Sequence, residues 1–235
     1  MFSKKPAKKN EPAKDRVTLY ITLGMVMFVL VTFVGFYLYA EAQKKNVPLP
    51  KMVDTVSVDN KVDKAIVINP ELKNVPVIDI WEDFQCPVCK KFEDATGLTL
   101  NKAIAEKKVT ARYHIVSFIG IESVLLANAA ACSADEGKFQ VFHNFLYKNQ
   151  PATENSNFWG TDTILIAGKA VGLESKEFTS CVKSGKYAKY VTYIQNDMVK
   201  HKINSTPTIL INGKELDRAT QYYDPIAFQA AIDKA

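Results

Sequence analysis

Residues 75–94 read VPVIDIWEDFQCPVCKKFED, an apolar run followed by Cys86-Pro87-Val88-Cys89 and a helix-favouring segment. The nearly continuous apolar residues before the cysteines predict a strand that is buried on both faces. Two cysteines three positions apart at a helix start lie one turn apart on the same face. The first one meets unpaired backbone N–H groups and the positive end of the helix dipole, which favour thiolate over thiol. Pro87 fits the first turn, because its missing N–H is not needed there.

Thiol–disulfide exchange requires only a thiolate and a second thiol close to it, here one helical turn away. Cys86 is predicted to form the mixed disulfide with a substrate, and Cys89 to resolve it. The main alternative is half of a zinc site, but zinc sites usually offer two close cysteine pairs or neighbouring histidines. Cys132 and Cys181 are solitary and distant, and no histidine lies near Cys86 in the sequence. We therefore expect redox chemistry with no metal and no organic cofactor.

The N-terminal part predicts a membrane anchor. Residues 17–40 carry no charge, and 24 residues of helix span about 36 Å, enough for a hydrocarbon core of roughly 30 Å. Residues 1–16 hold six basic and two acidic side chains, a net charge of +4, which places the N-terminus in the cytoplasm and the rest outside. Residues 40–42, Ala-Glu-Ala, are similar to a cleavage site, but a signal peptide has a shorter apolar core of about 7–15 residues. An uncleaved anchor is favoured.

The charge distribution excludes a nucleic-acid function. The chain of 235 residues has a formal charge of +5, so about +1 remains after the basic tail is removed. Binding of phosphates needs a basic patch on the folded part of a protein. Four cysteines, an even number, predict an oxidising compartment and two pairs.

The order of predicted elements indicates one α/β domain behind a tether. Residues 41–63 contain two prolines and mixed polarity and predict a linker, so the folded domain is expected at 64–235. The strand–helix–strand crossover around the cysteines implies a parallel, right-handed connection. A helical block is expected at about 120–202, inserted after the second central strand. Strands are predicted at 65–68, 75–81, 109–116, 208–211 and 215–216, and helices at 86–107, 123–136, 139–147, 161–171, 176–183, 187–201 and 226–234.

This order of elements, with Asp-Phe-Gln-Cys-Pro-Val-Cys-Lys at 83–90 and Ser-Thr-Pro-Thr at 205–208, resembles DsbA-like thioredoxin-fold proteins. It is most similar to the membrane-anchored forms of Gram-positive, particularly actinobacterial, cell envelopes. The resemblance covers about residues 64–235 and implies a thioredoxin-like fold with an inserted helical domain. It also implies a cis Thr206–Pro207 bond beside Cys86. The residues expected to bind substrate are Thr206, Pro207, Pro87 and Val88.

Among the acidic residues near the cysteines, Asp79 has two interpretations. Asp79 occupies the strand position where such folds keep a buried acid, which could shuttle a proton for Cys89. An outward-facing, structural Asp79 is equally open. Glu82 and Asp83 are expected to be solvated in the turn. Packing or surface roles are expected for the histidines, which are His114, His143 and His201.

Cys132 and Cys181 lie 49 positions apart in the helical block. Similar family members join such helices by a structural disulfide, which would stabilise the fold by up to about 4 kcal/mol. A second redox pair that relays electrons is the alternative.

Val88 departs from the strongly oxidising relatives, which have a histidine there that stabilises the reduced form. Oxidase, reductase and isomerase activities therefore all stay open.

We expect a single-pass membrane protein whose extracytoplasmic domain donates its Cys86–Cys89 disulfide to secreted or cell-envelope proteins. A membrane reoxidase of the DsbB or VKOR type would return the pair to the oxidised state. The alternative from another class is a membrane-tethered, peptide-binding chaperone whose cysteines are structural.

Overall fold

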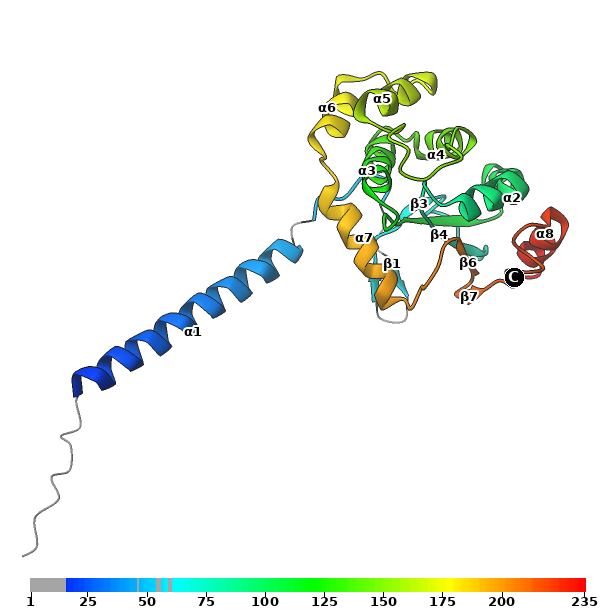
Figure 1. The fold of residues 1–235 in the computed structure, drawn as a ribbon. Helices are drawn as coiled ribbons and strands as arrows, with labels where there is room; N and C mark the ends of the chain where they lie inside the picture. The colour runs from blue at the N-terminus through cyan, green and yellow to red at the C-terminus, as the bar shows by residue number, and fades with distance from the viewer. Residues whose placement is uncertain (1–15, 46, 54–55, 59–60) are drawn as a thin grey trace, which may run out of the picture. The chain divides into compact units, whose positions relative to one another are not determined.

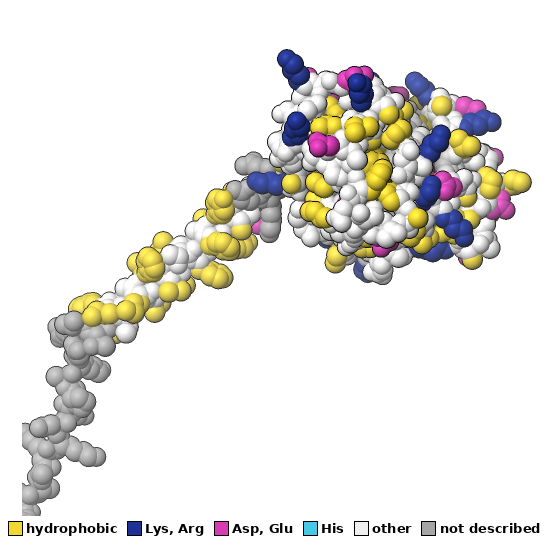
Figure 2. Space-filling model, turned by 45° about the horizontal axis from the view of Figure 1, so that its top comes forward, with side chains coloured by type: hydrophobic (Ala, Val, Ile, Leu, Met, Phe, Trp, Pro, Cys, Tyr) yellow, Lys and Arg dark blue, Asp and Glu magenta, His cyan; other side chains and the backbone are white. Residues whose placement is uncertain are grey.

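A computed structural model describes residues 16–45, 47–53, 56–58 and 61–235 (Figure 1). The chain divides into two compact units, Met1–Val47 and Pro48–Ala235. Helix α1 (Arg16–Lys45) forms most of the described part of the first unit. Its segment Leu19–Ala42, with mean hydropathy 2.3, is long and apolar enough to cross a membrane, and Figure 2 shows apolar side chains along it. The expected basic tail lies outside the described residues except for its last residue.

A five-stranded mixed sheet in the order β3-β5-β4-β6-β7 forms the centre of the second unit. The central pair, β4 and β5, is parallel, as the crossover predicts, and the other pairs are antiparallel. A separate hairpin of two short strands precedes this sheet. The strands are β1 (Val56–Val58), β2 (Lys61–Asp63), β3 (Ile66–Ile68), β4 (Val77–Glu82), β5 (Thr110–Ile115), β6 (Thr208–Ile211) and β7 (Lys214–Glu215).

Helices flank this sheet and form the expected insertion (Figure 1). Helix α2 begins directly after Cys86, contains Cys89 and packs against α8, where the rings of Phe92 and Phe228 lie 5.8 Å apart. A disulfide joins Cys132 on α3 to Cys181 on α6. The helices are α2 (Pro87–Ala105), α3 (Ile121–Asp135), α4 (Phe139–Lys148), α5 (Thr161–Ala170), α6 (Lys176–Ser184), α7 (Ala188–Lys200) and α8 (Pro225–Asp233).

The two faces of β4 meet different partners, because successive side chains of a strand point to opposite faces. Ile80 and Glu82 share one face, and both are completely buried. Asp79 and Trp81 share the other face, where the ring of Trp81 lies 5.4 Å from the ring of His201 at the end of α7. The sheet thus separates the acid at position 79 from the acid at position 82.

The second unit starts at Pro48, inside the stretch expected to be a linker. Val53 forms an isolated antiparallel bridge with Ile66, and the backbone N–H of Val67 donates to the carbonyl oxygen of Met52 at 2.9 Å. The chain before β3 therefore pairs along the edge of the sheet. Prolines and mixed polarity did not reveal this pairing, because it uses backbone groups rather than apolar side chains.

Candidate active site

Cys86 lies at the start of α2, as the sequence predicts. Its backbone is extended, with φ −72° and ψ 116°, which makes it the N-cap residue, and Pro87 follows in the first turn. Its Sγ accepts a hydrogen bond from the backbone N–H of Cys89 at 3.4 Å. Both cysteines are free thiols; Cys89 is completely buried, whereas 6% of Cys86 is exposed. Cys86 is therefore the thiol that a substrate can reach.

The two thiols differ in acidity. The hydrogen bond from the Cys89 thiol lowers the pKa of Cys86 to about 6, although burial acts in the opposite direction. Burial, together with the hydrogen bond and charge of Cys86 and the charge of Glu82, raises the pKa of Cys89 well above its usual range. At neutral pH the pair is a thiolate beside a buried thiol, which is the arrangement that thiol–disulfide exchange needs.

The loop before β6 faces the reactive thiol. The Thr206–Pro207 peptide bond is cis, as the resemblance implies, and the Cys86 Sγ lies 3.7 Å from the carbonyl oxygen of Thr206. Val88, in the turn between the cysteines, is 44% exposed. The structure therefore gathers at Cys86 the four residues expected to bind substrate: Pro87, Val88, Thr206 and Pro207.

Polar side chains that the sequence analysis did not single out fix the turn before Cys86. The side-chain amide of Gln150 donates to the carbonyl oxygens of Phe84 at 2.6 Å and of Cys86 at 3.1 Å. The side-chain amide of Gln85 donates to Glu122 Oε2 at 3.3 Å. The helical insertion thus holds the cysteine turn in place. No sequence signal marks these residues, because a glutamine in a polar loop has no distinguishing spacing.

Asp79 lies on the face of β4 that points away from Glu82. Its Oδ1 is 3.0 Å from Arg112 Nη1 and 3.0 Å from His114 Nε2, and the ring of Trp81 stacks on His114 with centroids 3.9 Å apart. The structure therefore places Asp79 in an ion pair within the sheet, which favours the structural one of its two interpretations. Strand alternation, read from the sequence, assigns the other face to Glu82.

The expectation that Glu82 and Asp83 are solvated is wrong, because both are completely buried. Glu82 Oε1 lies 2.5 Å from Nε2 of His143, which is on the inserted helix α4. Asp83 Oδ2 accepts hydrogen bonds from the backbone N–H groups of Phe118 and Ile119, and burial raises the pKa of this carboxyl. Strand β4 continues one residue beyond the predicted strand, and the insertion covers the turn that follows.

Glu93, one helical turn after Cys89, completes a cluster with Glu82 and His143, both of which are completely buried. Ligand atoms of these three side chains lie within 4.8 Å of one another. Burial raises the pKa of Glu93 to about 8. Burial opposes protonation of His143, but the Glu82 carboxylate outweighs burial and raises the pKa of His143 to about 9. One histidine and two carboxylates are a donor set that a divalent metal accepts, but the two closest donor atoms are hydrogen-bonded to each other.

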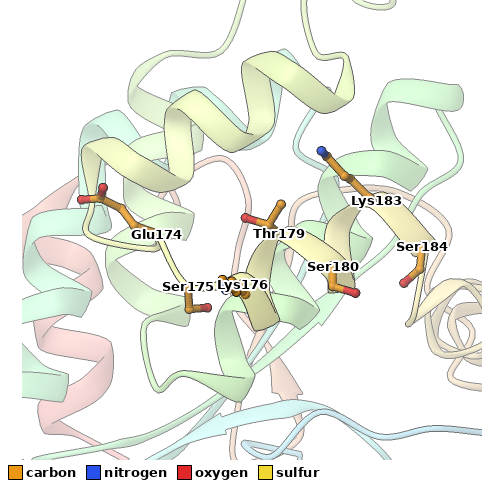
Figure 3. A pocket seen from close by; sticks show the side chains of 7 residues that line it. All are labelled: Glu174, Ser175, Lys176, Thr179, Ser180, Lys183 and Ser184. Atoms are coloured by element: carbon orange, nitrogen blue, oxygen red, sulfur yellow. The ribbon is translucent and has the colours of Figure 1, made fainter.

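A separate shallow hollow of about 580 Å³ lies on helix α6 and the turn before it (Figure 3). It contains no cysteine and none of the residues expected to bind substrate. Its lining consists of Glu174, Ser175, Lys176, Thr179, Ser180, Lys183 and Ser184.

Comparisons with known proteins agree with this geometry. A family model described as thioredoxin matches residues 71–234. A putative protein-disulfide oxidoreductase of Rickettsia felis is 25% identical over 195 residues, which are 82% of this chain and 66% of that protein. Disulfide bond formation protein D of Bacillus subtilis is 26% identical over 174 residues, which are 72% of this chain and 77% of that protein.

Among solved structures, reduced DsbA from Mycobacterium tuberculosis matches with a TM-score of 0.62 and 27% identity, over 72% of this chain and 91% of that one. The chain spans about two thirds of the length of the Rickettsia felis relative. The predicted thioredoxin-like fold and the resemblance to DsbA-like proteins are confirmed.

Proposed function

This chain belongs to the thioredoxin family, which its residues 71–234 match, and from that premise we propose that it is a DsbA-type thiol–disulfide oxidoreductase that introduces disulfides into other proteins. One observation carries the proposal. A cysteine with a pKa of about 6 lies at the start of a helix, one turn from a fully buried thiol and beside a cis Thr206–Pro207 bond.

The reaction proceeds through two exchanges. A substrate thiolate attacks Cys86 Sγ of the oxidised pair, the Cys86–Cys89 bond breaks, and Cys89 leaves with the electron pair. A second substrate thiolate then attacks the substrate sulfur of the mixed disulfide and releases Cys86 as a thiolate. The substrate loses two electrons and two protons, and the enzyme pair is reduced. Backbone groups of the Thr206–Pro207 loop and the exposed Val88 hold the substrate chain against Cys86.

The acidity of Cys86 supports the oxidising direction. A thiol whose pKa falls from 9.0 to about 6 stabilises the reduced form at pH 7 by about 1.4 kcal/mol. For a two-electron couple this makes the disulfide more oxidising by about 30 mV. Val88 donates no hydrogen bond from its side chain, so the thiol of Cys89 is the main donor that stabilises the thiolate.

The enzyme acts at a membrane and outside the cytoplasm. Helix α1 carries a segment, Leu19–Ala42, with the length and apolarity of a membrane span, and the basic residues 4–16 keep the N-terminus in the cytoplasm. The Cys132–Cys181 disulfide, which joins α3 and α6, fits an oxidising compartment. Its partners are secreted or envelope proteins with free cysteines, and a DsbB- or VKOR-type membrane protein that reoxidises the pair.

Trapping of mixed disulfides in cells tests this function. Full-length Cys89→Ala protein cannot resolve the intermediate, so it should accumulate reductant-sensitive adducts with extracytoplasmic proteins. The matched control, Cys86→Ala with Cys89 intact, should form none, because Cys89 is completely buried. A Cys86→Ala protein that supports every function of the wild type would instead assign the chain to the tethered chaperones.

A further inference from the structure

Lysines gather on one helix of the second unit, although the chain without its basic tail carries a formal charge of only about +1. Residues 183–202 contain five lysines and a single acidic residue, and all five lysines are exposed. The acid, Asp197, is 1% exposed, so it adds little negative charge to the surface. Residues 48–64 hold three lysines and three aspartates and add no net charge. Helix α7 therefore carries a basic strip that the net charge of the chain does not reveal.

A tyrosine on α7 groups the lysines of this strip with one from another segment. Lys189, Tyr193 and Lys200 follow one another at intervals of four and seven residues, which places them on one face of the helix. The Nζ atom of Lys200 lies 5.0 Å from the centre of the Tyr193 ring, and the Nζ atom of Lys64 lies 4.4 Å from the same centre. The ring therefore interacts with two ammonium groups. Lys64, Lys189, Tyr193 and Lys200 form what we term the lysine face.

The start of α7 lies beside the segment through which the chain enters the second unit. The backbone N–H of Lys51 donates to Asp135 Oδ1 at 3.1 Å, and Lys186 Nζ donates to Oδ2 of the same carboxylate at 2.7 Å. The hydroxyl of Tyr190 on α7 donates to the carbonyl oxygen of Lys64 at 2.8 Å. Side chains of the helical insertion thus hold the entering chain against α7.

The chain between the apolar span and this carboxylate is short. The apolar segment ends at Ala42, and α1 ends at Lys45. The last turn of α1 spans about 5 Å, and the six residues from there to Lys51 span at most about 22 Å when fully extended. If α1 crosses a membrane, the start of α7 therefore stays close to the membrane surface. A bilayer is thus the polyanion that this helix can always reach.

We propose that the lysine face binds the anionic headgroups of phospholipids in the membrane that holds α1, and that this contact keeps the catalytic domain on the membrane surface. The inference rests on the proposed membrane anchor and goes beyond the proposed thiol chemistry. Each lysine close to an anionic bilayer strengthens binding about fivefold. Together, the three lysines of the face should strengthen it about 10²-fold.

Docking through α7 would hold the reactive thiol near the bilayer. The ring of His201, at the end of α7, lies 5.4 Å from Trp81 on the strand that leads to Cys86. The loop that follows α7 contains Thr206, whose carbonyl oxygen lies 3.7 Å from Cys86 Sγ. Helix α7 therefore has the entering chain at its start and the active-site loop after its end. A thiol partner in the same membrane would meet Cys86 at a higher effective concentration than a partner in solution.

Energy transfer from tryptophan to a dansyl-labelled lipid tests the inference on the full-length chain in nanodiscs. Both tryptophans, Trp81 and Trp159, lie in the second unit, so transfer reports how closely this unit approaches the bilayer. The wild type should transfer more in discs of equimolar phosphatidylglycerol and phosphatidylcholine than in discs of phosphatidylcholine alone. This difference should disappear in about 1 M salt, where the Debye length is about 3 Å. The salt dependence needs no variant.

A triple variant tests the named lysines. Lys64→Gln, Lys189→Gln and Lys200→Gln, combined in one chain, keep polar side chains at the surface and remove three charges. The ratio of docked to undocked domains in the mixed discs should fall about 10²-fold. Transfer should then equal that in phosphatidylcholine discs.

A matched control removes three exposed lysines elsewhere and should keep the wild-type difference. Its substitutions, at the end of α2 and just after it, are Lys102→Gln, Lys107→Gln and Lys108→Gln. The inference is overturned if the wild type transfers equally in both kinds of disc, or if the lysine-face variant keeps as much of the difference as the control.

These outcomes are separate from the proposed thiol chemistry. Trapping of substrates by Cys89→Ala does not depend on the lipid, so the oxidoreductase function would stand if docking failed. A chain that does not stay with discs of phosphatidylcholine alone would overturn the membrane anchor and the inference together.

Discussion

The acidity of Cys86 depends on its neighbour, and one substitution tests this dependence. The thiol of Cys89 is the largest influence that lowers the pKa of Cys86 to about 6. Cys89→Ala removes that donor. A hydrogen bond to a charged group contributes about 1.5–3 kcal/mol. The substitution should therefore lower the acid dissociation constant of the Cys86 thiol roughly 10- to 100-fold. Cys89→Ser retains a donor and should stay close to the wild type.

The assay is the pH dependence of alkylation by iodoacetamide on the reduced, full-length chain in detergent. Cys86 is the accessible thiol, so the rate reports its thiolate fraction. The wild type should reach half of its maximal rate near pH 6 and change little between pH 7 and 9. Cys89→Ala should reach that point at a clearly higher pH, with Cys89→Ser between the two. Equal midpoints for the wild type and Cys89→Ala would show that Cys89 does not set the acidity of Cys86. A wild-type rate that still rises tenfold per pH unit at pH 8 would show that the pKa of Cys86 is not lowered.

Other outcomes follow from the same contacts. The pKa of Cys86 is lower in the folded than in the unfolded chain, so the unfolded state binds more protons, and the reduced chain should gain about 3 kcal/mol of stability over the oxidised chain from pH 6 to 9. This gain is lost as the pH falls through 6, and urea unfolding of both redox forms that shows no such divergence would contradict it. Gln150→Ala removes two hydrogen bonds to the cysteine turn and should lower stability by about 1–3 kcal/mol. Thermal unfolding that matches the wild type would show that these hydrogen bonds do not stabilise the fold. Replacing Cys132 and Cys181 together by alanine should cost about 4 kcal/mol of stability and leave the alkylation midpoint of Cys86 unchanged; an altered midpoint would indicate a redox role for this second pair.

Local features of this chain could be predicted from the sequence. The cysteine turn, its strand and its helix are adjacent in sequence, so periodicity and the fixed chemistry of Cys86 and Pro87 locate them. The Thr206–Pro207 bond is more than a hundred residues away, and its cis form followed from the family resemblance rather than from spacing. The parallel pairing of the central strands followed from the length of their crossover.

The cluster of Glu82, Glu93 and His143 could not be predicted, because its members come from three separate elements. Asp79 and Glu82 are both acids on β4. Which of them contacts His143 depends on which face of the strand the inserted helix α4 covers. His143 stands in a run of aromatic residues that indicates packing, and nothing near it in sequence marks Glu82 as its partner. Long-range pairing of this kind becomes visible only when α4 is placed against β4.

The reduction potential of the Cys86–Cys89 pair, measured on the full-length chain by equilibration with glutathione and thiol trapping, distinguishes a donor of disulfides from a disulfide reductase. We expect a value closer to that of DsbA, about −120 mV, than to that of thioredoxin, about −270 mV. A value near −270 mV would contradict disulfide donation and identify the chain as a reductant fed by a membrane electron donor.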